Sequence, residues 1–113
     1  MSTGAIGAIE RLLAESDEAD DALRGAVATL VAEPEIDWAG IGFVEGDAIA
    51  LGPAAGVPDE SRRKRVPILF SEALVGELLV DGDVDPSLLE QVAARLAPHV
   101  LIGWDTGGEA WEP

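Results

Sequence analysis

The segment that most narrows the choice of fold is residues 37–56, which reads DWAGIGFVEGDAIALGPAAG. Two short apolar runs, residues 39–44 and 48–52, flank a turn made of Glu45, Gly46 and Asp47. Apolar runs on either side of a short connection that contains Gly and Asp are typical of a β-hairpin. The segment therefore predicts two antiparallel strands in the middle of the chain.

A second pair of short apolar runs follows, at residues 66–70 and 74–80, joined by residues 71–73. Pro67 has no N–H to donate to a neighbouring strand, so we expect the third strand to lie at an edge of the sheet. Residues 53–65, which separate the hairpins, are rich in Pro, Gly and charge and are expected to form a loop.

Helical periodicity appears on both sides of the hairpins. Apolar residues fall on one face in an N-terminal helix (Ile6, Ile9, Leu12, Leu13) and in a second helix ending before Pro34 (Leu23, Ala26, Val27, Leu30, Val31). A last helix is expected with Asp85 as its cap and Pro86 in its first turn. Pro98 predicts a kink or a stop. We favour a kink, because the apolar face continues to Trp104.

The order helix, helix, hairpin, hairpin, helix predicts an α+β domain. We expect a four-stranded antiparallel sheet in the order 2-1-4-3, with helices on one face. Residues 1–105 are expected to form the single domain, and residues 106–113 a mobile tail.

The strands hardly alternate between apolar and polar residues, although a sheet with one solvated face should do so. We expect the second face to be covered either by another protomer or by a small ligand. Ile41, Phe43, Leu78 and Trp104 are the candidate interface residues.

The charge balance is strongly acidic, with 22 acidic and 7 basic residues and a net charge of −15. This charge repels nucleic acid and anionic membranes, so neither is expected as a partner. No secretory signal or apolar span is visible, and a cytoplasmic location is expected. The chain contains no cysteine, which excludes disulfides and a thiol nucleophile.

Four of the basic residues are consecutive: Arg62, Arg63, Lys64 and Arg65. Guanidinium groups bind carboxylates and phosphates, so the run is a candidate site for a small anionic ligand or an acidic protein segment. A solvated loop that offsets the acidic charge is the alternative, and it is the one that charge runs usually represent.

Catalytic and metal sites find little support in the sequence. His99 is the only histidine, and no nucleophile accompanies it. Asp81, Asp83 and Asp85 alternate, but they lack the remaining ligands of a calcium loop. We interpret them as turn and capping residues, and we predict no catalytic residue, metal or cofactor.

The block from Trp38 to Pro53 resembles the GAF-domain family, in particular the type that reduces free methionine-(R)-sulfoxide. The two-helix segment before it and the segment RVPILFSEALVGELLVDGDVDP, residues 65–86, are also similar to that family. The resemblance implies a GAF-like fold over most of the chain.

The chain departs from the family where that family carries its chemistry. The resemblance implies that the longer segment bearing the catalytic cysteines is reduced to residues 57–65. The resemblance also implies three carboxylates that bind the amino group of free methionine. Arg63 stands where the family has Glu, and Leu79 replaces the first of two Asp residues. Asp81 keeps the second and is therefore, with residues 62–65, a candidate binding residue. We therefore expect a non-catalytic, homodimeric interaction domain, with an anionic-metabolite sensor as the alternative and an enzyme of unknown type as the weakest hypothesis.

Overall fold

The structure, a computed structural model, describes residues 3–45 and 48–110, with side chains for residues 4–45 and 48–101. The turn at residues 46–47 and the side chain of Trp104 therefore lie outside the described part. Helices α1 (Thr3–Glu15) and α2 (Ala19–Val31) precede the first hairpin, strands β1 (Ile36–Glu45) and β2 (Ala48–Gly56). A 3-10 turn, η1 (Glu60–Arg62), leads into β3 (Arg63–Phe70), β4 (Ala73–Gly82) and helix α3 (Pro86–Ala110).

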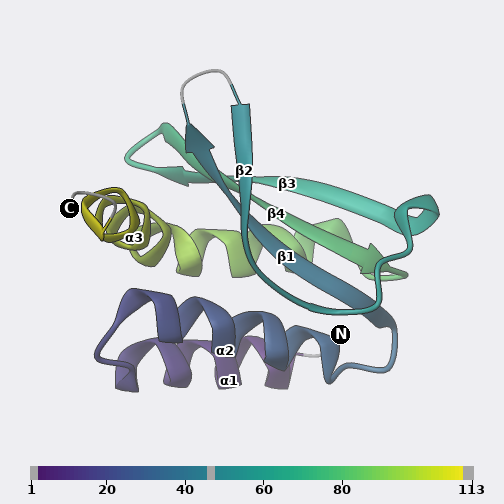
Figure 1. The fold of residues 1–113 in the computed structure, drawn as a ribbon. Coiled ribbons are helices and arrows are strands. Elements are labelled where there is room, and N and C mark those ends of the chain that lie inside the picture. The colour runs from purple at the N-terminus through teal and green to yellow at the C-terminus, as the bar shows by residue number, and fades with distance from the viewer. Residues whose placement is uncertain (1–2, 46–47, 111–113) are drawn as a thin grey trace.

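The sheet is antiparallel with the order β2-β1-β4-β3, which confirms the predicted topology and places β3 at an edge. Figure 1 shows all three helices on one side of this sheet. The predicted stripe of α2 is buried at Leu23, Ala26, Val27 and Leu30. The fold is thus the α+β arrangement expected from the sequence.

The core lies between the helices and one face of the sheet. Ile41 of β1 and Leu78 of β4 are fully buried there with Leu96 of α3. Phe43 is half-buried and packs against the same cluster. Ile41 and Leu78 are therefore inaccessible to a partner chain, contrary to the interface predicted for them, whereas the interface role of the half-buried Phe43 stays a prediction.

The strands extend beyond the predicted apolar runs, and the connection between the hairpins is correspondingly short. Residues 53–56 belong to β2, and residues 63–65 begin β3. The basic residues pair with β4 in register, with Arg63 opposite Asp81 and Arg65 opposite Leu79. Apolar periodicity does not detect such a strand end, because the end is stabilised by pairing with the neighbouring strand and not by burial of apolar side chains.

Helix α3 continues through Pro98 and does not stop at Ala97. Proline removes one backbone hydrogen bond and crowds the preceding turn, which bends a helix. The bend is visible in Figure 1, where the green part of α3 lies across the view and the yellow part points toward the viewer. The helical backbone reaches Ala110, and the mobility expected of the tail stays a prediction.

The start of α3 confirms the predicted cap. The Asp85 carboxylate accepts hydrogen bonds from the backbone N–H of Ser87 at 2.9 Å and from its hydroxyl at 3.0 Å. These bonds lower the pKa of Asp85. None of the described helices is both long and apolar enough to cross a lipid bilayer.

Candidate functional site

The candidate site is a shallow hollow of about 380 Å³ on the sheet face that points away from the helices. Successive strand residues point to opposite faces, so the neighbours of the core residues line this outer face. The hollow is lined by apolar residues (Trp38, Ile49, Leu51, Pro58, Leu79) and by charged ones (Glu60, Arg63, Arg65, Glu77). We call it the outer-face hollow.

Trp38 forms part of the floor of the outer-face hollow. A Cβ atom placed on Gly40 would lie 2.5 Å from the Trp38 ring, so the glycine leaves the space in which the ring lies. Trp38 lies on the sheet face that points away from the helices, because positions 38 and 40 alternate with the core positions 39 and 41.

Arg63 lies over Trp38, with its guanidinium carbon 4.5 Å from the ring centroid. At this distance the cation is attracted to the face of the indole. The same guanidinium binds Asp81 through two parallel hydrogen bonds, Nε to Oδ1 at 2.7 Å and Nη2 to Oδ2 at 2.9 Å. This bidentate geometry is the strongest that an arginine and a carboxylate can adopt.

Asp81 is fully buried, and its carboxylate is satisfied from two directions. Besides the bonds from Arg63, it accepts one from the backbone N–H of Asp59 at 2.7 Å. The hydrogen bonds from Arg63 lower the pKa of Asp81, and the Asp59 N–H adds to that effect against the opposing influence of burial. The same contact raises the pKa of Arg63.

The other basic residues of the run also have partners within the chain. Arg62 donates to Asp37 at 2.7 Å, and Lys64 donates to the carbonyl of Gly82 at 2.7 Å. Arg65 donates to Glu77 at 3.1 Å. Every side chain of the predicted anion-binding run therefore has an internal acceptor, which favours its structural interpretation over a free anion site.

The chain turns from β2 toward Asp81 at Gly56, whose φ is +94°. Residues that carry a side chain rarely adopt this backbone conformation. A Cβ atom at Gly56 would also lie 2.2 Å from the carbonyl oxygen of Asp37. Val57 then donates to that same carbonyl at 2.9 Å. The turn brings Asp59 to Asp81 and closes one side of the outer-face hollow.

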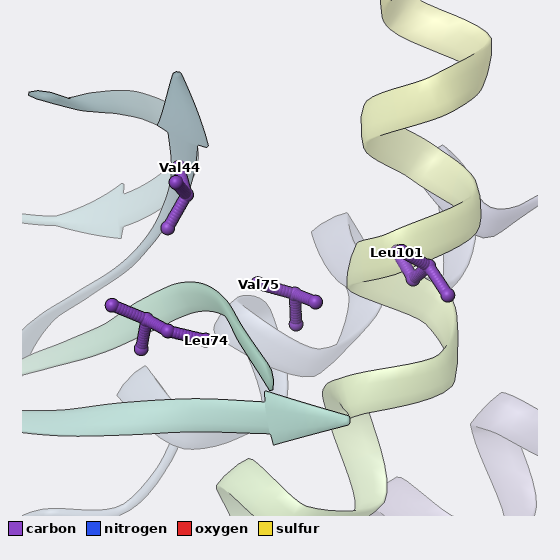
Figure 2. A pocket seen from close by; sticks show the side chains of 4 residues that line it. All are labelled: Val44, Leu74, Val75 and Leu101. Atoms are coloured by element: carbon purple, nitrogen blue, oxygen red, sulfur yellow. The ribbon is translucent and has the colours of Figure 1, made fainter. Parts of the chain in front are cut away.

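A second, smaller hollow of about 220 Å³ lies at the end of the sheet near α3. Figure 2 shows its four lining side chains: Val44 of β1, Leu74 and Val75 of β4, and Leu101 of α3. These described lining residues are apolar and offer no group for acid–base or covalent chemistry.

The structure brings the candidate residues Arg63, Arg65 and Asp81 into one region, and it adds Trp38, Ile49, Leu51 and Pro58, which the sequence analysis did not single out as site residues. The Trp-x-Gly spacing is the signal that could have revealed Trp38, since both residues lie on one face of a strand. His99 lies on α3, where its Nδ1 is buried and has no hydrogen-bond partner among the residues that the structure describes. The described residues contain no cluster of side chains that could hold a metal ion.

Solved structures with the same fold are GAF domains and free methionine-R-sulfoxide reductases. The reductase of Staphylococcus aureus in complex with its substrate has a TM-score of 0.71 and 18% identity, covering 87% of this chain and 94% of its own. The GAF domain of Acinetobacter phosphoenolpyruvate-protein phosphotransferase has a TM-score of 0.71 and 15% identity, over 96% and 99%. A putative GAF sensor protein from Burkholderia vietnamiensis has a TM-score of 0.72 and 15% identity, over 86% and 91%.

These similarities show that the chain has the GAF-like fold. No protein-family model matches the chain. A stretch of 64 residues is 31% identical to the coproporphyrin III ferrochelatase of Geobacillus kaustophilus (strain HTA426). That match covers 52% of this chain and 20% of the ferrochelatase, so the chain spans about a fifth of the relative's length.

Proposed function

We propose that this GAF-type domain is a non-catalytic interaction domain that works as a homodimer. The observation that carries the proposal is the position of Arg63. Its guanidinium covers the Trp38 ring and donates hydrogen bonds to both carboxylate oxygens of the buried Asp81. The polar end of the outer-face hollow is therefore filled by the chain itself.

The residues of the chain support this proposal over the chemistry of the reductases that share its fold. The chain contains no cysteine and therefore has no thiolate that could attack a sulfoxide. The pairing of Arg63 with Asp81 also neutralises the carboxylate that the resemblance implies for binding an amino group. The hollow leaves apolar surface accessible at Ile49 and Leu51, beside the exposed side chains of Glu60 and Arg65.

A small-molecule sensor is the second candidate. The observation that favours it is the volume of the outer-face hollow, about 380 Å³, combined with an indole ring on its floor. An anionic metabolite would have to compete with Glu77 for Arg65 and with Asp81 for Arg63. This competition is why we place the sensor second.

Two measurements on the full chain test the proposal. Light scattering on a sizing column, over a range of protein concentrations, is expected to give the mass of a dimer. Incubation with free methionine sulfoxide and a thiol reductant is expected to give no more reduction than the reductant alone. A monomer at every concentration or a measurable turnover would contradict the proposal.

A thermal-shift screen with anionic metabolites separates the two candidates. The homodimer proposal expects no stabilisation by any of them. Stabilisation that disappears in the triple variant Arg62→Gln, Arg63→Gln, Arg65→Gln would instead identify the sensor. The exposed arginine of α2 offers a control, because Arg24→Gln should leave any such binding unchanged.

A further inference from the structure

The two edges of the sheet are protected very differently. The edge strand β3 begins with Arg63, Lys64 and Arg65 and contains Pro67. Helices pack against both edge strands, α3 against β3 and α2 against β2, so the difference lies in the strand residues. Charged residues and proline are devices by which proteins keep an edge strand from pairing with another chain. The other edge strand, β2, carries no charged residue over its whole length, Ala48–Gly56.

The first five residues of β2 form the unprotected part of this edge. They are paired with β1 on one side, and no described strand pairs with their other side. Pro53 follows them and cannot donate a hydrogen bond, so further pairing along the strand would end there. We call residues 48–52 the β2 edge.

The apolar side chains of the β2 edge are accessible to solvent. Ile49 is 42% exposed and Leu51 is 61% exposed. They are two positions apart and therefore lie on the same face of the sheet, the face of the outer-face hollow. An unpaired backbone edge with apolar side chains beside it is a template for another strand.

The net charge decides what kind of contact a second copy can make. Two chains of charge −15 repel each other wherever their acidic surfaces meet. Of the four described strands, β2 is the one without a charged residue. Approach along the β2 edge brings backbone groups and apolar side chains together with no acidic residue in the contacting segment.

We propose that two copies of this chain pair along their β2 edges in an antiparallel manner, with the two-fold axis at Ala50. This register places Ile49 of each copy opposite Leu51 of the other, on one face of a sheet that continues across the dimer. The contact is self-complementary, as a two-fold interface must be. The inference rests on the proposed homodimer and names its surface.

A pair of matched lysine substitutions tests the surface. Leu51→Lys places a charge in the β2 edge, while Leu69→Lys places the same charge on β3, where the leucine is 50% exposed. Both changes reduce the net negative charge, so general repulsion falls equally in both variants. We expect Leu51→Lys to raise the dimer dissociation constant by about tenfold or more and Leu69→Lys to leave it within about twofold.

An engineered cysteine tests the register, because the natural chain has none that could interfere. Directly opposite residues of antiparallel strands have Cα atoms about 4.5–5.5 Å apart, a distance that a disulfide can span. Ala50→Cys is therefore expected to form a covalent dimer on mild oxidation, and Leu69→Cys is expected to remain uncoupled.

The outcomes separate this inference from the proposed function. A dimer that survives Leu51→Lys, with no cross-link through Cys at position 50, would overturn the β2 surface and leave the homodimer intact. A wild-type chain that is monomeric at every concentration would overturn both. Thermal unfolding of each variant checks that the fold is retained, which the exposure of Leu51 and Leu69 leads us to expect.

Discussion

At the scale of single residues, the ion pair of Arg63 and Asp81 is the contact that defines the outer face. A fully buried carboxylate is tolerated only when it is paired and hydrogen-bonded, and Asp81 meets both conditions through Arg63 and Asp59. Removing one partner of such a pair leaves the other buried without compensation. The pair therefore contributes to stability as well as to the closure of the hollow.

We predict that Asp81→Asn lowers the free energy of unfolding at pH 7 by about 3 kcal/mol, a cost typical of removing one member of a buried pair. Because the pKa of Asp81 is lowered in the folded chain, its contribution is present above the unfolded-state pKa of about 4. It is lost as the pH falls through the folded-state pKa. Urea unfolding between about pH 7 and pH 2 should therefore show a smaller loss for Asp81→Asn than for the wild type.

The control for this prediction is Asp20→Asn on α2. Asp20 pairs with Arg24 at 3.0 Å, but both side chains are more than half exposed, so its loss should change stability by less than about 1 kcal/mol. Equal effects of the two substitutions at pH 7 would show that the Arg63–Asp81 pair is no more important than a surface ion pair.

At the scale of elements, the turn after β2 decides where the connection between the hairpins runs. We predict that Gly56→Ala lowers the free energy of unfolding by more than about 1 kcal/mol, because a left-handed backbone conformation is unfavourable for alanine. The added methyl group would also meet the Asp37 carbonyl. Urea unfolding at pH 7 measures the difference.

A second glycine serves as the comparison. Gly7 lies inside α1, and a Cβ atom there would meet nothing within 4 Å. Gly7→Ala should therefore raise stability by about 0.5–1 kcal/mol through helix propensity alone. A Gly56→Ala variant as stable as the wild type would show that the turn relaxes without cost.

At the scale of the whole molecule, the excess of acidic residues opposes folding through self-repulsion. The net charge is −15, and screening by salt shortens the range of that repulsion. We predict that the thermal midpoint rises by several degrees as sodium chloride increases from about 0.02 M to about 0.3 M and then levels off. A midpoint that falls, or that climbs in proportion to salt up to about 1 M, would assign the effect to something other than charge screening.

The elements and their order could be predicted from the sequence because each depends on local patterns. The stripe Leu23–Leu30 of α2, the cap at Asp85 and the edge position of β3 with its Pro67 all follow from spacing and from the hydrogen bonds that proline lacks. The resemblance to GAF domains, based on the block that begins at Trp38, agrees with the fold found in the structure.

The direction of each side chain, and therefore the site, could be determined only by the tertiary structure. Ile41 and Leu78 were predicted as interface residues but are fully buried, because an apolar strand carries no sequence mark of which face meets the helices. Arg63 and Asp81 are 18 residues apart in the chain, and only the register of β3 against β4 sets them opposite each other. The sequence alone determined which elements form, since turns, caps and apolar periodicity act over a few neighbouring residues. Only the folded sheet brings the basic residues 62–65 to their acceptors elsewhere in the chain, because those acceptors are distant in the sequence.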